Sequence, residues 1–198
     1  MIKTVFFDMD GTIYDEAYPK VRAELLTSEY INQKTNIDTY AIYNTFRRVK
    51  ATFTSGCNDA KCKNNRKLWY QKTLEELNIF SITGDDASDY YWNTLLNNLE
   101  PYIDFIHVLP WFKSNFELFI LTDETIDICQ KKLKCLGLEK EFKEVISSEH
   151  VGETKPSKKL YNLALSVASR TPDEVVVIGD NPSPDILGGN TAGLYTRW

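Results

Sequence analysis

The fold of this chain is decided by its N-terminal stretch, Ile2-Lys-Thr-Val-Phe-Phe-Asp8-Met-Asp10-Gly-Thr12. Residues 2–7 are mostly β-branched or aromatic, which predicts a buried strand. The apolar run stops at two carboxylates and a glycine, which is typical of a strand that ends in a polar turn. If both carboxylates share one pocket, their repulsion makes both hard to ionise without a cation. A hard divalent metal such as Mg²⁺ would resolve this conflict.

Further segments of the same kind follow along the chain, and helical patterns lie between them. Strands that alternate with helices predict a Rossmann-like α/β core, a parallel sheet with helices on both faces. In such a sheet the ligand site lies at the carboxyl ends of the strands. The strand candidates are residues 115–121, 145–147, 174–178 and 194–196, and the helix candidates are 125–136 and 157–169.

Residues 15–100 differ from the rest of the chain. They hold almost no continuous apolar strand, and their spacing predicts amphipathic helices rich in aromatic residues. Because this block falls between the first strand and the rest of the sheet, we predict an inserted all-helical cap domain over the site. The α/β core would then comprise residues 1–14 and 101–198. The predicted cap helices are 20–34, 38–54, 62–78 and 86–99.

The composition argues against several classes of partner. The chain has 198 residues and a formal net charge of −5, whereas a duplex nucleic-acid binder normally presents a basic face. We therefore expect no nucleic-acid partner and no membrane partner. No apolar stretch approaches the roughly 20 residues that span a bilayer. Because no secretory signal is recognisable either, we expect a cytoplasmic protein with reduced cysteines.

Two of the four cysteines lie close together, in the segment Cys57-Asn-Asp-Ala-Lys-Cys62. They could form half of a zinc site, but a structural zinc site needs four ligands. The two histidines, His107 and His150, lie far along the chain. We favour two thiols in a cap loop or at a helix start.

Polar residues recur just after the later predicted strands. Thr122 closes one strand, Lys155 precedes Pro156, and Asp180 and Asp185 follow another strand. Each residue has a plain structural interpretation: Lys155 as a surface lysine, Thr122 as a cap of the next helix, Asp185 as a helix N-cap. Together with the N-terminal carboxylates, however, they supply a nucleophile, metal ligands, a hydroxyl donor and a cation at one edge of the sheet.

With these residues in this order, the sequence resembles the haloacid dehalogenase-like hydrolases, a superfamily of mostly phosphatases. The resemblance spans residues 2–196, and the helical insert resembles the cap of one large branch. All four motifs of the family are present. They match Asp8, Asp10 and Thr12 in the first, Thr122 in the second, Lys155 in the third, and Gly179, Asp180 and Asp185 in the fourth.

The resemblance implies catalytic and substrate-binding roles. Asp8 would be the nucleophile that takes the phosphoryl group, and Asp10 would protonate the leaving alcohol and then activate water. Thr122 and Lys155 would hold the phosphoryl oxygens. Asp123 stands where the family often has Asn, and we count it among the candidate substrate-binding residues. Facing the site, it would disfavour strongly anionic substrates; alternatively it turns away or bonds the loop backbone.

The resemblance also implies a Mg²⁺ cofactor. The Asp8 carboxylate, the Asp10 backbone carbonyl and Asp180 would hold the metal, and Asp185 would ligate it or orient a bound water.

The implied activity is that of a phosphatase for a small phosphomonoester, in a monomer or homodimer. Phosphoglycolate, sugar phosphates and nucleoside monophosphates all remain candidates. Family dehalogenases usually lack an acid two residues after the nucleophile, so Asp10 favours phosphate chemistry. A phosphomutase, which returns the phosphoryl group to a bound sugar phosphate, and a silent regulatory binding protein are the alternatives.

Overall fold

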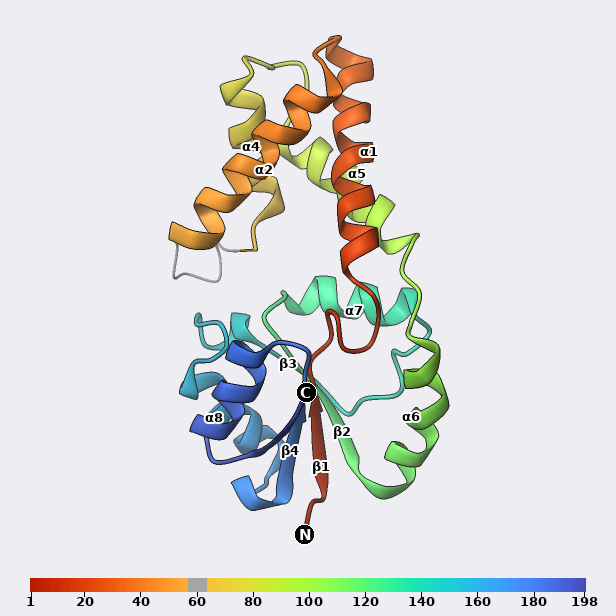
Figure 1. Ribbon diagram of the computed structural model, residues 1–198, viewed down its shortest axis with the longest axis vertical. Coiled ribbons are helices and arrows are strands. Elements are labelled where there is room, and N and C mark those ends of the chain that lie inside the picture. Colours follow the sequence, from red (N-terminus) through yellow and green to blue (C-terminus); the bar gives the residue numbers. More distant parts are fainter. Residues whose placement is uncertain (57–63) are drawn as a thin grey trace. The chain divides into compact units, whose positions relative to one another are not determined.

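A computed structural model describes residues 1–56 and 64–198 (Figure 1). These residues form two compact units. The first, here called the α/β unit, comprises Met1–Glu16 and Leu99–Trp198, and the second, the helical unit, comprises Ala17–Asn98. Cys57 and Cys62, for which the sequence leaves two interpretations, lie outside the described residues.

The α/β unit is built on a five-stranded parallel sheet with the order β3-β2-β1-β4-β5. The N-terminal strand lies at the centre, and all four of its residues are buried because neighbours cover both faces. The predicted Rossmann-like α/β fold is therefore confirmed. The strands are β1 (Thr4–Phe7), β2 (Glu117–Thr122), β3 (Val145–Ser147), β4 (Val175–Ile178) and β5 (Tyr195–Arg197).

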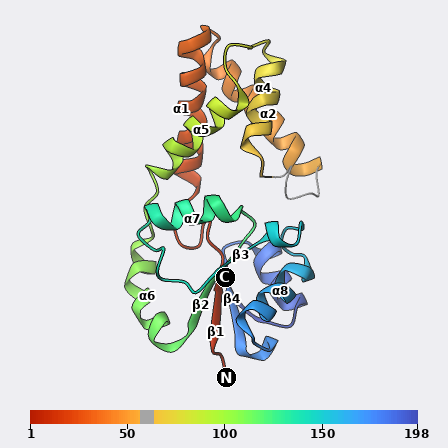
Figure 2. The same ribbon diagram turned by 180° about the vertical axis from the view of Figure 1, so that it is seen from behind.

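Helices cover both faces of this sheet, and α6 and α8 lie on opposite sides of it in both views (Figures 1 and 2). The helical segments of the unit are α6 (Ile103–Asn115), α7 (Ile126–Cys135), η1 (Ser148–His150), α8 (Lys158–Ala168), η2 (Pro172–Glu174), the π-helical η3 (Pro182–Leu187) and α9 (Gly188–Thr191).

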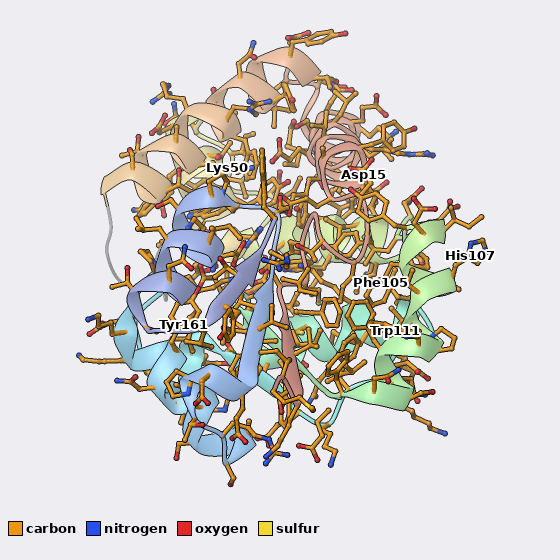
Figure 3. All side chains as sticks on the ribbon, turned by 60° about the horizontal axis from the view of Figure 1, so that its bottom comes forward. Asp15, Lys50, Phe105, His107, Trp111 and Tyr161 are labelled. Carbon is orange, nitrogen blue, oxygen red and sulfur yellow. The ribbon has the colours of Figure 1, made fainter. Side chains whose placement is uncertain are left out.

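Successive residues of β1 point to opposite faces and pack with different helices. Phe6 joins a buried cluster that includes Leu160 of α8. Phe7 makes edge-to-face contacts with Phe105 and Phe112 of α6, with ring centroids 5.5 and 5.2 Å apart. Figure 3 shows Phe105 on the inner side of α6 and His107 on its outer side.

Helix α6 is the main element that the sequence did not predict, whereas α7 and α8 lie within two residues of their predicted bounds. Pro110 lies inside α6, and a proline at that place normally indicates the end of a helix because it lacks an N–H donor. Packing of the apolar side of α6 against the sheet outweighs that local cost.

The helical unit has a core of aromatic side chains, as predicted. Phe46 stacks on Tyr70 with centroids 4.3 Å apart, and Tyr91 lies beside Tyr70. Within the described residues, no helix is both long and apolar enough to cross a membrane. The helices of this unit are α1 (Ala17–Thr35), α2 (Thr39–Gly56), α4 (Arg66–Glu76) and α5 (Gly84–Leu96).

Candidate active site

The carboxyl ends of three adjacent strands bring the predicted residues together. The Asp8 N–H, directly after β1, donates to the carbonyl of Ile178 at the end of β4. Thr122 is the last residue of β2, on the other side of β1. Parallel pairing places residues that are more than 100 positions apart at one edge of the sheet.

Lys155 lies between two carboxylates at this edge. Its Nζ is 2.5 Å from Asp8 Oδ1 and 2.7 Å from Asp185 Oδ1, and it also donates to the carbonyl of Leu121 at 3.1 Å. Burial alone would lower the pKa of Lys155, but Asp8 and Asp185 outweigh it and raise the pKa. Lys155 is thus a buried cation, and the alternative of a surface lysine is wrong.

The environment of Asp8 is strongly perturbed. Burial raises the pKa of its carboxyl to about 7, Lys155 opposes that rise, and Asp185 adds to it. The hydroxyl of Thr12 donates to Asp8 Oδ2 at 3.3 Å. A buried carboxylate of this kind gains from any further cation placed beside it.

Three carboxylates meet in a geometry that suits a metal. Ligand oxygens of Asp8, Asp180 and Asp185 all lie within 4.8 Å of one another. One lysine cannot neutralise three carboxylates, and hard divalent cations prefer oxygen ligands. Burial raises the pKa of Asp180, and the nearby Asp185 carboxylate raises it further. The donor set therefore fits Mg²⁺.

Two glycines allow the carboxylates to approach the backbone. A Cβ on Gly11, which has φ +84°, would lie 2.5 Å from Asp180 Oδ2. A Cβ on Gly179 would lie 2.5 Å from Asp185 Oδ2. Either side chain would displace a carboxylate of the cluster, so both positions require glycine.

Two of the structural alternatives for site residues are wrong. Asp185 is not an N-cap: it lies inside η3, and Asn181 caps that segment. Thr122 does not cap α7, because its hydroxyl accepts the N–H of Glu124 in the preceding turn, at 3.1 Å. The first N–H of α7, that of Ile126, bonds instead to Glu149.

Asp123 adopts one of its two anticipated arrangements. Its Oδ1 accepts the backbone N–H of Lys155 at 2.8 Å, and its carbonyl accepts the hydroxyl of Ser148 at 3.0 Å. Asp123 thus bonds the loop backbone and joins the turn after β2 to the loop that carries Lys155.

The side chain of Asp10 is not part of the acidic cluster. Its Oδ1 accepts a hydrogen bond from Lys132 Nζ at 2.7 Å and another from the hydroxyl of Tyr14. Glu124 Oε2 lies 3.5 Å from the same Nζ. The metal-binding role expected of Asp10 belongs to its backbone carbonyl and does not involve this side chain.

The sequence interpretation missed Tyr14, Glu124 and Lys132. A signal for Lys132 was present, because it lies three residues after Cys129 and four before Leu136, on the apolar side of the predicted helix. A charged residue at such a position is rarely buried unless it is paired.

A parallel sheet that gathers acids around a buried lysine at its carboxyl edge defines a Rossmann-like α/β protein with a candidate metal centre. More specifically, the chain belongs to the haloacid dehalogenase-like hydrolases, whose family model matches residues 2–193. The resemblance seen in the sequence is thereby confirmed.

The similarity to individual relatives extends over most of the chain. A ribulose-1,5-bisphosphate 5-phosphatase of Halopiger xanaduensis is 29% identical over 99% of this chain and 84% of its own. The magnesium-bound hydrolase YfnB of Bacillus subtilis superposes with a TM-score of 0.72 at 24% identity, covering 100% of this chain and 88% of its own. A 2-haloacid dehalogenase of Pseudomonas syringae superposes with a TM-score of 0.74 at 23% identity, covering 100% of this chain and 86% of its own. At these identities, the two structures show the fold alone.

Proposed function

We propose that this protein is a Mg²⁺-dependent phosphatase that hydrolyses a small phosphomonoester through an aspartyl-phosphate on Asp8. The observation that carries the proposal is the buried Asp8 carboxylate, with Lys155 at 2.5 Å and the oxygens of Asp180 and Asp185 within 4.8 Å. A carboxylate nucleophile needs cations on its side to approach an anionic phosphate.

In the first half of the reaction, an oxygen of Asp8 attacks phosphorus, and the bond from phosphorus to the leaving oxygen breaks. The electron pair stays on that oxygen, which takes a proton from Asp10 and departs as the alcohol. The ammonium of Lys155 neutralises charge on the phosphoryl oxygens. Thr122 is the last residue of the neighbouring strand, and its hydroxyl binds the same phosphoryl group.

In the second half, the carboxylate of Asp10 accepts a proton from water while the water oxygen attacks phosphorus. The bond from phosphorus to Asp8 breaks, which releases inorganic phosphate and restores both aspartates. Mg²⁺ held by Asp8, Asp180, Asp185 and the Asp10 carbonyl would supply positive charge throughout. The magnesium bound by YfnB supports this choice of metal.

Phosphate chemistry is favoured over carbon–halogen cleavage because of Asp10. Breaking a carbon–halogen bond releases a halide, which needs no proton, whereas an alkoxide leaving group does. The fold by itself does not decide, since the structural neighbours include a dehalogenase. The Halopiger xanaduensis relative is a ribulose-1,5-bisphosphate 5-phosphatase, which supports a sugar phosphate as the substrate class.

The test measures inorganic phosphate released from a panel of phosphomonoesters, with Mg²⁺ and with EDTA. We expect metal-dependent release that Asp8→Asn abolishes. The matched control is Asp127→Asn, because Asp127 is exposed and forms a surface ion pair with Lys131. No release by folded, metal-loaded wild type on any ester would contradict the proposal, and transfer to a second sugar phosphate would indicate a mutase.

A further inference from the structure

Lys132 is a fully buried lysine beside the proposed acid and base. It lies on α7 and is 0% exposed, with Nζ 2.7 Å from Asp10 Oδ1 and 3.5 Å from Glu124 Oε2. Burying an ammonium group is costly unless carboxylates pair with it. Two carboxylates therefore flank the buried Lys132 ammonium, and the shorter contact is to Asp10.

Tyr14 holds the same carboxylate from another element. Its hydroxyl also donates to Asp10 Oδ1, and its carbonyl accepts the N–H of Gly11 at 3.1 Å, which closes the turn that carries both residues. The Lys132 ammonium lies 5.8 Å from the centre of the Tyr14 ring.

Two donors on one oxygen restrict the carboxyl group. Because Oδ1 already accepts bonds from Lys132 and Tyr14, a proton carried by the carboxyl resides on the other oxygen, Oδ2. Proton transfer depends on a donor within hydrogen-bond reach of the reacting oxygen. Fixing which oxygen carries the proton therefore fixes the geometry of transfer.

We propose that Lys132 is a positioning residue: with Tyr14 it clamps Oδ1 of Asp10, so that Oδ2 delivers the proton to the leaving alcohol. This inference rests on the proposed phosphatase function and adds a role that lies outside the four motifs. Glu124, whose Oε2 lies 3.5 Å from Nζ, pairs with the same lysine.

The inference predicts a dependence on the leaving group. An alkoxide needs the proton of Asp10, whereas p-nitrophenolate leaves without one. The ratio kcat/KM reports the steps up to departure of the leaving group, so loss of positioning lowers it for an alkyl ester only. General damage to the site would instead lower it for both esters.

The experiment compares kcat/KM for p-nitrophenyl phosphate and for the best alkyl phosphate of the panel, using full-length Lys132→Met. We expect kcat/KM to fall about 100-fold on the alkyl ester, because a positioned general acid contributes about 100-fold or more to the rate. On the aryl ester we expect a loss of at most about threefold, because that leaving group needs no proton. Lys132→Arg, which keeps a charged donor, recovers part of the loss. Lys131→Met, the exposed neighbour, matches wild type on both esters.

Equal losses on the two esters, or no loss on either, would overturn the inference. If Lys132→Met does not fold, Tyr14→Phe removes the second donor at almost constant volume. Tyr14→Phe must then lower kcat/KM on the alkyl ester alone. An equal loss on both esters would refute the positioning of Asp10 by Lys132 and Tyr14. Wild type inactive on both esters would refute the proposed phosphatase itself, which keeps the two failures distinct.

Discussion

Substituting Gly11 by alanine tests whether the acidic cluster binds the metal. Gly11 has φ +84°, and a Cβ there would lie 2.5 Å from Asp180 Oδ2 and 2.9 Å from its Cγ. An ordinary contact begins at 3.4 Å, so the Asp180 carboxylate must move by about 0.9 Å. Asp180 is an exposed residue.

Two effects follow, and they differ in size. The left-handed backbone costs alanine roughly 1–2 kcal/mol, which lowers the Tm by roughly 2–8 °C for a chain of this length. The displaced carboxylate weakens metal binding, and changes of that kind around a metal typically cost about 10- to 100-fold in affinity. We therefore expect the Mg²⁺ concentration for half-maximal activity to rise about tenfold or more.

A second glycine separates backbone strain from displacement of Asp180. Gly137 has φ +71°, but nothing lies within 4 Å of the position that a Cβ would take there. Gly137→Ala should lower the Tm to a similar extent and leave the Mg²⁺ requirement unchanged. The assay is a Mg²⁺ titration of phosphate release, paired with thermal unfolding in EDTA.

A Gly11→Ala variant with the Mg²⁺ requirement of wild type would show that Asp180 does not bind the metal as proposed. An equal shift of that requirement in Gly137→Ala would show that backbone strain alone accounts for the effect.

Two further predictions concern the core of the α/β unit. Burial raises the pKa of the Cys129 thiol to about 12. At pH 8, iodoacetamide should therefore modify the exposed Cys135 and spare Cys129. Peptide mass spectrometry measures the modification, and equal modification of both thiols would contradict the prediction. Phe7→Ala should lower the free energy of unfolding in urea by about 3–5 kcal/mol because it leaves a cavity under α6, whereas the exposed Phe80→Ala should change it little.

Much of the fold follows from local sequence. The residues of β1 are apolar on both faces, which is what a central parallel strand requires. All five strands and most of the helices were therefore predicted within a few residues. The main exception is α6, where the local signal of Pro110 conflicts with the packing that keeps the helix intact.

The sequence by itself also determined which residue types gather at the site. Asp8 and Asp180 follow a strand and Thr122 ends one, and parallel strands present their carboxyl ends at one edge. The positions of these residues at strand ends can be predicted without knowing where their side chains point.

Only the tertiary structure decided which of these side chains pair. Lys155 bridges Asp8 and Asp185, and Lys132 holds Asp10 from a helix 122 positions away. Such contacts depend on how α7 packs against the sheet and on the rotamers that this packing allows. A linear sequence specifies residue types and spacing, whereas the direction of a buried lysine is set by the surroundings that remove it from water.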